Sequence, residues 1–203
     1  MGYDGDHSPT FAWNSRSVLE NPQAAHDKIM EEVHLGRVGG PFKAPPFPNF
    51  KVSPLALRQK DDGKQRLLHN LSAPYDFSSV NLCIDDAHTK VTYSSIADAT
   101  AIIAEMPGCY LAKADIKSAF RLVPIRPSDY HLLGFSFEGN FYFDKCLPMG
   151  CRSSCMIFQR VSDALVHVLR ERYGIDRIVK YLDDFLFFGK TKEECASCLD
   201  FFL

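Results

Sequence analysis

The sequence lacks an apolar run long enough to cross a bilayer. Its first residues, MGYDGDHSPTFAWNSRS, contain no apolar core of the kind that forms a secretory signal. We therefore expect an intracellular protein that does not enter a membrane. A basic targeting cluster is also missing, so the sequence does not distinguish cytoplasm from nucleus.

The sequence has no basic excess either, because its formal net charge is −2 over 203 residues. Composition alone therefore does not indicate a nucleic-acid-binding protein, although an acidic centre can offset basic grooves elsewhere in one molecule. The apolar fraction of 46% is that of an ordinary globular protein. The length suits one good-sized domain, or two small subdomains that share a core.

The cysteine count is odd, with seven residues and no export signal, so we expect reduced thiols. Cys195 and Cys198 could supply half of a zinc site. Four-ligand zinc needs a second pair, and Cys151 and Cys155 have the spacing of a helix instead. We therefore favour buried, apolar cysteines over a zinc site.

The N-terminal part of the sequence combines one helix with irregular segments. Residues 1–20 carry little pattern, and we expect an irregular lead-in there. Asn21 as a cap and Pro22 in the first turn predict a helix that ends near Gly36. Residues 39–50 are dense in proline and glycine, which predicts an extended, irregular connector.

Residues 52–71 predict a β-hairpin that turns at Asp62-Gly63. Positive charge gathers near the tip of its arms, and a solvated surface hairpin is the simplest interpretation of that charge. The basic residues are Arg58, Lys60, Lys64 and Arg66.

The rest of the chain alternates helices with strands. A helix is predicted over residues 94–106, and the strand that follows over 109–116 ends in a carboxylate. Residues 132–146 predict a second hairpin, and residues 153–172 predict the clearest helix. A capping box that begins at Thr191 opens a final helix. The apolar stripe expected along the 153–172 helix is Ile157, Val161, Ala164, Leu165 and Val168.

The stretch KYLDDFLFF, residues 180–188, places Asp183 and Asp184 between two strand-forming arms. Adjacent aspartates suit a solvated surface turn. The arms are too apolar for an exposed hairpin, however, and a second apolar strand, YLAKAD, ends at Asp115. If the two elements pair, three carboxylates converge and need a hard cation such as Mg²⁺. Two such ions about 4 Å apart serve in-line phosphoryl displacement in polymerases.

Four motifs of the sequence resemble, in order, the fingers–palm core of reverse transcriptases. YLDD (181–184) is similar to the family's Y-x-D-D motif, and ADIKSAF (114–120) to the palm motif with the first metal-binding aspartate. LPMGCRSS (147–154) resembles the loop that leads into the palm helix. GKQRLLHNLS (63–72) resembles the fingers motif that binds the incoming triphosphate. The amino-acid sequence of these motifs looks closest to retrotransposon enzymes of the DIRS-like and related long-terminal-repeat groups.

The resemblance implies an RNA-directed DNA polymerase of a retrotransposon, which adds deoxynucleotides to a primer 3′-hydroxyl. The implied fold is α+β, an antiparallel palm sheet backed by helices with a smaller fingers subdomain, as in a polymerase right hand that lacks its thumb. We expect the reverse transcriptase domain over 21–203, with fingers at about 21–108 and palm at about 109–203, truncated before the thumb. The chain is then a fragment, or one part of a longer retrotransposon polyprotein.

The resemblance also implies roles for individual residues. Two Mg²⁺ ions, or Mn²⁺ in their place, would be held at the catalytic site by Asp115, Asp183 and Asp184 with the Ile116 carbonyl assisting. Tyr181 would lie near the primer end. The partners would be an RNA or DNA template with its primer, and deoxynucleoside triphosphates. The residues that would contact the incoming nucleotide are Lys60, Lys64, Arg66, Ser118, Ala119, Phe120, Met149 and Gly150.

These roles have physical reasons. An arginine fork matches phosphate oxygens, which suits Arg66. The ring of Phe120 would crowd a ribose 2′-hydroxyl, although an aromatic residue after a strand is also a common core residue. Gly150 would let the backbone come close to a ligand. Met149 departs from the family, where many members carry glutamine, and a thioether donates no hydrogen bond. Gln59 replaces a second lysine that some members have.

Two alternatives stay open at this point. One is an element remnant that keeps the fold and binds nucleic acid without turning over. The other is a different two-metal enzyme, such as a nuclease or another nucleotidyltransferase. The basic hairpin and Phe120 disfavour a nuclease, because a nuclease has no nucleoside triphosphate to hold.

Overall fold

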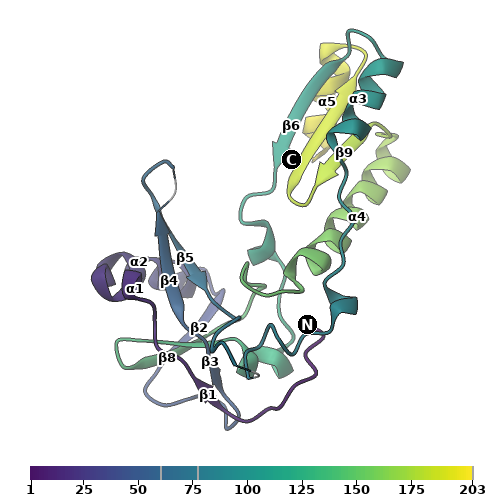
Figure 1. Cartoon of the computed structure of the whole chain (residues 1–203). Coiled ribbons are helices and arrows are strands. Elements are labelled where there is room, and N and C mark those ends of the chain that lie inside the picture. The colour runs from purple at the N-terminus through teal and green to yellow at the C-terminus, as the bar shows by residue number, and fades with distance from the viewer. Residues whose placement is uncertain (60, 77, 203) are drawn as a thin grey trace. The chain divides into compact units, whose positions relative to one another are not determined.

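The computed structural model describes residues 1–59, 61–76 and 78–202. The chain folds into two compact units, which can be followed along the chain by colour in Figure 1. The larger unit comprises Met1–Thr89 and Phe120–Ser154, and the smaller unit comprises Lys90–Ala119 and Cys155–Leu203.

The bounds of these compact units differ from residues 21–108 and 109–203, the expected fingers and palm, which stay a prediction. Residues 120–154 fold with the N-terminal segment, because their hairpin pairs with strands from that segment. Residues 90–108 fold with the C-terminal segment. The unit that carries the basic hairpin is therefore the larger of the two.

A five-stranded mixed sheet in the order β1-β3-β7-β8-β2 forms the centre of the larger unit. β7 and β8 are the hairpin predicted over residues 132–146, and Glu138 and Gly139 at its turn have φ values of 47° and 72°. Positive φ at both central residues gives a turn that matches the twist of the strands. The strands are Thr10–Phe11 (β1), Lys51–Val52 (β3), Gly134–Phe137 (β7), Asn140–Asp144 (β8) and Val38–Phe42 (β2).

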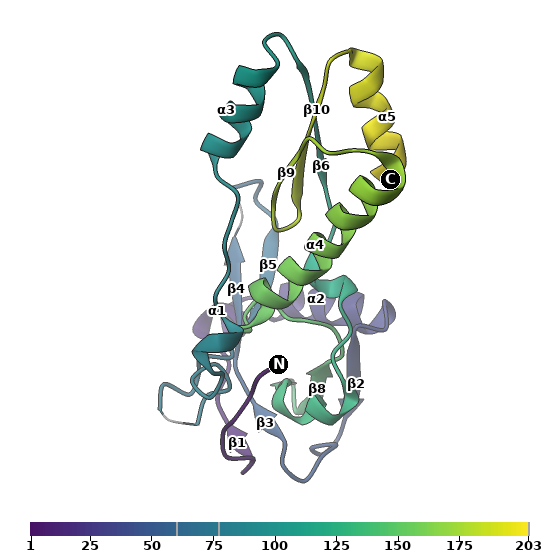
Figure 2. The ribbon, with the colours of Figure 1, turned by 90° about the vertical axis from the view of Figure 1, so that its right-hand side faces the viewer.

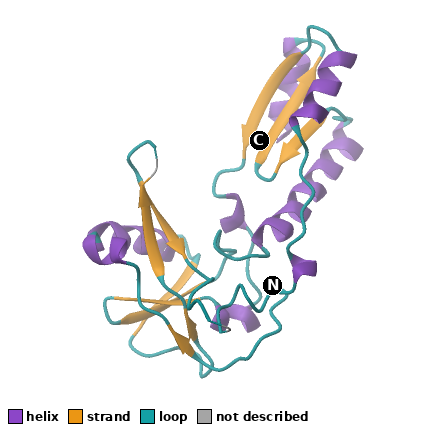
Figure 3. Ribbon diagram, in the orientation of Figure 1, coloured by secondary structure: helices purple, strands orange, loops and turns teal. Residues whose placement is uncertain are grey.

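The basic hairpin predicted over residues 52–71 is confirmed as β4 (Leu55–Gln59) paired with β5 (Gln65–His69). Figure 3 shows these two strands and the loop that joins them. In that loop the Asp62 Oδ1 accepts a hydrogen bond from the Lys64 amide at 3.0 Å, and Gly63 has a φ of 79°. The tight turn predicted from Asp62-Gly63 is therefore present.

Two helices of the larger unit, α1 (Arg16–Glu20) and α2 (Pro22–His34), follow each other directly. α2 confirms the helix predicted from Pro22, and Gly36 has a φ of 70° beyond its end. The Asn21 side chain does not cap this helix. Its Nδ2 donates instead to the Ser17 carbonyl at 3.2 Å.

The irregular lead-in expected over residues 1–20 contains two short ordered elements, β1 and α1. β1 pairs in parallel with β3, and the Ser15 amide donates to the Leu55 carbonyl at 2.9 Å. Val18 of α1 is buried in the same core cluster as Ala25 and Leu55. A single buried valine is too little to produce a periodic pattern, so this anchoring could not be predicted from the sequence.

The predicted irregular connector over residues 39–50 begins too early. β2 extends to Phe42 and pairs antiparallel with β8, with a register irregularity between Gly39 and Phe42. A Cβ on Gly39 would lie 2.5 Å from the ring of Phe143. The glycine therefore serves close packing within a sheet, where the sequence suggested an irregular chain.

A three-stranded antiparallel sheet in the order β6-β10-β9 forms the smaller unit. Its core contains residues from the sheet together with residues of α4 (Ser154–Tyr173) and α5 (Lys192–Phe202). In Figure 2, α3 (Ile96–Glu105) and α5 lie on opposite sides of this sheet. The predicted antiparallel sheet backed by helices is thus confirmed. The strands are Tyr110–Asp115 (β6), Ile178–Tyr181 (β9) and Asp184–Gly189 (β10).

Most of the apolar stripe predicted along α4 lies on the wrong face of the helix, although Leu165 does pack against the core. Phe158 and Leu169 are buried, whereas Val161 is 45% exposed. Ser162 belongs to the buried face, where its Oγ accepts a hydrogen bond from the Lys180 Nζ at 3.1 Å. Since α4 carries apolar residues on both faces, periodicity alone could not separate them, and a buried serine concealed the correct one.

Short 3₁₀ helices complete the described elements, at Asp86–His88 (η1), Ala119–Leu122 (η2) and Pro127–Leu132 (η3). Across residues 1–59, 61–76 and 78–202, none of the helices combines the length and apolarity needed to span a bilayer.

Candidate active site

The acidic turn joins β9 to β10 in the smaller unit. Tyr181 and Asp184 are register partners, so Leu182 and Asp183 form the turn between them. Leu182 has a φ of 54°, a left-handed conformation that costs a residue with a Cβ about 1–2 kcal/mol. Backbone strain of this kind is found where the surrounding structure requires a particular turn, and functional sites are common examples.

Asp115, the last residue of β6, lies directly opposite Asp184, the first residue of β10. The Ile116 amide donates to the Asp183 carbonyl at 3.0 Å, which extends the pairing past the strand end. Directly opposite residues of an antiparallel pair lie on the same face, with Cβ atoms about 4.5–5.5 Å apart. The structure therefore brings Asp115, Asp183 and Asp184 to one edge of the sheet.

The two faces of this sheet differ in character. Ala114 and Phe185 are buried in the core that α4 and α5 share with the sheet. Because side chains alternate along a strand, Asp115 and Asp184 belong to the opposite face. Asp115 is exposed and Asp184 is half-buried. The carboxylates therefore remain accessible to ligands from solution.

Lys113 shares the face of Asp115, since it lies two residues earlier on β6. Its Nζ lies 2.8 Å from the Asp184 Oδ1. The hydrogen bond and charge of Asp184, followed by the charges of Asp115 and Asp183, raise the pKa of Lys113. All three acids thus act on one ammonium group. Lys113 was not predicted as a site residue, although the alternation of Lys113, Ala114 and Asp115 along a strand indicates that Lys113 shares the face of Asp115.

A divalent metal ion suits the donors at this edge. Over the described parts of the chain, no group of three or more His, Cys, Asp or Glu side chains is arranged to hold a metal. Asp115 and Asp184 nevertheless present carboxylate oxygens on one face beside Asp183, and such oxygens are preferred by Mg²⁺ and Mn²⁺. The edge already attracts one cationic group, Lys113. The chemistry of these oxygen donors therefore suits a hard cation, and Lys113 is the cationic group that contacts Asp184 in this structure.

The other residues predicted for this unit have partners of their own. The Ala119 amide donates to the Ile116 carbonyl at 3.2 Å, so these two groups already bond to each other. Ser118 is exposed and has a φ of 57°. Tyr181 is 52% exposed and stacks on Tyr93, with ring centroids 4.7 Å apart. Tyr93 was not predicted, because it lies outside every recognised motif.

The remaining predicted residues belong to the larger unit. Lys60 lies outside the described residues. Lys64 is exposed, and its Nζ lies 3.5 Å from the Asp62 Oδ2. Arg66 stands directly opposite Arg58 on β4. Like charges opposite each other are unfavourable, so this pair favours a bound anion.

Arg66, Met149 and Gly150 line one cavity of the larger unit, with a volume of about 280 Å³. A Cβ on Gly150 would lie 2.0 Å from the His69 carbonyl oxygen. The glycine is therefore required for close contact between two backbone segments, whether or not a ligand approaches it. Phe120 is buried, with 8% of its surface exposed.

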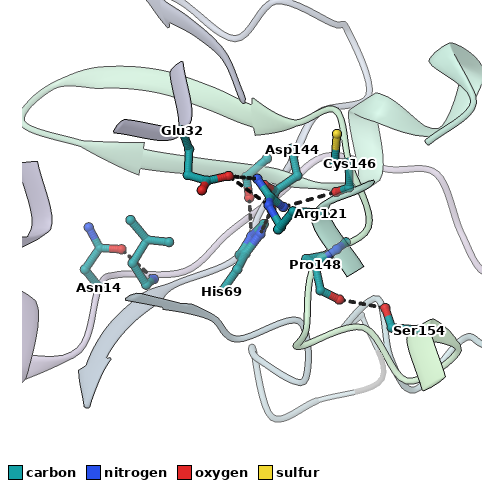
Figure 4. A network of polar contacts seen from close by, with 10 residues as sticks. Asn14, Glu32, His69, Arg121, Asp144, Cys146, Pro148 and Ser154 are labelled. Atoms are coloured by element: carbon teal, nitrogen blue, oxygen red, sulfur yellow. Dashed lines mark hydrogen bonds and ion pairs between the residues drawn. The ribbon is translucent and has the colours of Figure 1, made fainter. Parts of the chain in front are cut away.

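A buried polar network lies along the same cavity, and Figure 4 shows it from close by. Arg121 contacts Glu32 and Asp144 through ion pairs of 2.8 and 2.7 Å, and it donates to the Cys146 carbonyl at 3.2 Å. His69 bonds to the Asp144 Oδ2 through Nδ1 at 2.8 Å and to the Gly134 carbonyl through Nε2 at 3.1 Å. Both ring nitrogens therefore face oxygen atoms.

Opposing effects act on the charges of this network. Burial alone would raise the pKa of Asp144, but the charge of Arg121 and the hydrogen bond and charge of His69 hold it below its usual value. Burial would likewise lower the pKa of Arg121, but Asp144 and Glu32 raise it overall. The network therefore keeps its charges in the folded state. It fixes the segment around Cys146, immediately before the loop with Met149 and Gly150.

Comparison with known proteins places these observations in a family. The family profile described as reverse transcriptase (RNA-dependent DNA polymerase) matches residues 60–203. The Gag-Pro-Pol polyprotein of Mason-Pfizer monkey virus is 26% identical over 201 residues, covering 93% of this chain and 10% of the polyprotein. That of human T-cell leukemia virus 2 is 26% identical over 190 residues, covering 88% of this chain and 12% of the polyprotein. The chain thus spans about a tenth of the length of these curated relatives.

Solved structures show the same fold. The prototype foamy virus protease–reverse transcriptase has a TM-score of 0.71 at 22% identity, covering 98% of this chain and 24% of that one. A foamy viral protease–reverse transcriptase in complex with double-stranded DNA has a TM-score of 0.69 at 20% identity, covering 98% of this chain and 31% of that one.

Proposed function

The chain belongs to the reverse transcriptase family, and from that premise we propose that it is the polymerase core of an RNA-directed DNA polymerase from a retroelement. It would add deoxynucleotides to the 3′-hydroxyl of a primer. One observation supports this proposal above all others: Asp115 faces Asp184 at the sheet edge where the turn holds Asp183. The assignment to DIRS-like elements stays a prediction from the sequence.

Members of this family generally use a divalent metal ion. The finer part of our proposal is that two Mg²⁺ ions, or Mn²⁺, act at the acidic edge. Asp115, Asp183 and Asp184 would hold them, with the Ile116 carbonyl as a further oxygen ligand. When bound, the ions would lower the pKa of the primer hydroxyl and neutralise charge on the triphosphate and the departing pyrophosphate.

The protein's own residues would bind and orient the nucleotide. Arg66, helped by the lysines of the same hairpin, would bind triphosphate oxygens, for which a guanidinium fork is well shaped. The amide of Ser118, an exposed residue, is the better phosphate donor of the two predicted, because the Ala119 amide already bonds to the Ile116 carbonyl. Phe120 would exclude a ribose 2′-hydroxyl. Tyr181 would lie at the primer end.

The partners of this proposal are an RNA or DNA template with its primer, and deoxynucleoside triphosphates. The family's own description, RNA-dependent DNA polymerase, supports a nucleic-acid template. The foamy viral structure with double-stranded DNA supports a duplex partner for this fold. Because the matched relatives are polyproteins, we also propose that the chain acts as part of a longer one.

A primer-extension assay tests the proposal. The wild-type chain is expected to incorporate deoxynucleotides on an RNA template when Mg²⁺ or Mn²⁺ is present. Asp183→Asn should abolish incorporation, since it removes a charged metal ligand without changing side-chain size. Asp200→Asn, which neutralises an exposed aspartate of α5, is the matched control and should leave activity unchanged.

The outcomes separate the alternatives. Incorporation that survives Asp183→Asn would refute the metal assignment. A wild-type chain that binds primer–template duplex without extending it would favour the remnant that keeps only the fold and nucleic-acid binding.

A further inference from the structure

The Lys113 ammonium group contacts Asp184, one of the three carboxylates that would hold a metal ion. Its Nζ is 2.8 Å from the Asp184 Oδ1, and the charges of Asp115 and Asp183 act on it as well. Its register partner on β10 is the uncharged Leu186, so the contact with Asp184 is diagonal along the face that carries the aspartates. The lysine is therefore directed toward the carboxylates and not toward the residue opposite it.

The contact has a clear electrostatic reason. Asp115 and Asp184 lie opposite each other with Asp183 adjacent, and like charges at such distances are unfavourable. An ammonium group beside them offsets part of this repulsion. A divalent ion bound to the same oxygens would do so more completely, and it would repel the ammonium group.

Release of the lysine costs little. The side chain of Lys113 is 64% exposed and that of Asp184 is 44% exposed, so the pair is screened by solvent. The lysine stem is flexible and its ammonium group is well hydrated. Lys113 can therefore pair with Asp184 when no metal is bound, and it can dissociate from Asp184 when a metal ion binds.

We propose that Lys113 is a positioning residue that competes with the divalent ion for Asp184 and so sets the metal concentration at which the acidic edge is filled. This inference rests on the proposed function, since it takes the three aspartates as metal ligands. It goes beyond that function by assigning metal sensitivity to a residue outside the ligand set.

Binding of Mn²⁺ to the metal-free chain tests the proposal without any measurement of activity. Free Mn²⁺ is followed by electron paramagnetic resonance at fixed ionic strength, because salt screens an exposed pair. Lys113→Met should lower the Kd for Mn²⁺ by about two- to fivefold, the range that corresponds to an exposed ion pair. Lys113→Arg, which restores the charge, should return the Kd toward the wild-type value.

Lys192→Met is the matched control, because it removes the same charge from an exposed position at the start of α5. It should leave the Kd unchanged. Circular dichroism melting of each variant shows whether the chain is folded, so that a change in Kd is not mistaken for unfolding.

Asp184→Asn separates the two proposals. If Asp184→Asn weakens Mn²⁺ binding while Lys113→Met leaves the Kd unchanged or raises it, the role of Lys113 is refuted and the metal site stands. If neither the wild-type chain nor Lys113→Met binds Mn²⁺ in a way that depends on Asp184, the metal site fails and the role of Lys113 fails with it. Tighter binding by Lys113→Met that Asp184→Asn removes supports both.

Discussion

Asp115 and Asp184 are register partners at adjoining ends of β6 and β10, so two carboxylates face each other on one side of an antiparallel sheet. Sheets ordinarily avoid like charges in this arrangement, because opposite residues approach more closely than any others on the two strands. Replacement of either aspartate by a neutral residue would relieve the repulsion. The pair is therefore better explained by a ligand than by stability of the fold.

Asp115→Asn should stabilise the chain in the absence of metal. The change removes repulsion from Asp183 and Asp184 and loses only the attraction to Lys113. We expect the melting temperature in a chelator to rise by about 1–4 °C. With Mn²⁺ in excess the wild-type chain should have the higher melting temperature of the two. Bound Mn²⁺ stabilises the protein that retains all three aspartates more than the one that has lost Asp115.

Differential scanning calorimetry with and without Mn²⁺ measures both effects, with Asp200→Asn as the charge-matched control. A lower melting temperature for Asp115→Asn in the chelator would show that this carboxylate serves the fold itself.

The elements at the acidic edge could be predicted from the sequence because their signals are local. Aromatic and β-branched residues on both sides of Asp183 favour strands, and the aspartates favour a turn. The pairing of β6 with β10 was only a condition in the prediction, under which three carboxylates would converge and need a hard cation, and the structure shows that this pairing exists. The turn signal of Asp62-Gly63 and the helix-start signal of Pro22 are equally local, and both the hairpin and the helix that they predict are present.

The features that escaped prediction depend on contacts between distant residues. His69 and Asp144 are 75 positions apart, and the sequence around each residue does not indicate the other as its hydrogen-bond partner. The buried face of α4 depends on Ser162 and its bond to Lys180 on β9. Val18 is buried only because α1 packs into a core built from other elements. The hydrophobic pattern of a sequence describes one helix or strand at a time. It therefore does not predict contacts between residues that are distant in the sequence.

The buried network predicts a pH dependence of stability. The pKa of Asp144 is held below its ordinary value of 3.8 by Arg121 and His69 against the effect of burial. The folded chain therefore binds this proton less readily than the unfolded chain does. Its contribution to stability is complete above the unfolded-state pKa and is lost as the pH falls through the lower pKa of the folded state.

Urea unfolding between about pH 6 and pH 3 measures this dependence. Asp144→Asn should be less stable at neutral pH, since Arg121 and His69 lose a charged partner, and its stability should fall less steeply toward acid. Asp163→Asn, at an exposed carboxylate of α4 paired with Lys180, is the control and should keep the wild-type slope. An unchanged slope for Asp144→Asn would show that other carboxyl groups dominate acid unfolding.

Phe120 has two interpretations that one substitution separates. As a sugar gate, its ring excludes the 2′-hydroxyl, and Phe120→Ala should raise incorporation of ribonucleotides relative to deoxynucleotides by about tenfold or more. As a core residue, which its 8% exposure also permits, its truncation should destabilise the chain by about 3–5 kcal/mol and leave sugar selectivity unchanged.

The ratio of the two incorporation rates decides between these interpretations, because unfolded molecules lower both rates equally. Phe137→Ala, at a buried phenylalanine in a core cluster of the same unit, is the matched control for loss of packing. Phe120→Leu keeps more of the buried volume and tests the gate in a chain that folds more readily. A raised ratio for both Phe120 variants, with the wild-type ratio for Phe137→Ala, assigns the selectivity to the ring of Phe120. Equal ratios in all of them would leave Phe120 a core residue.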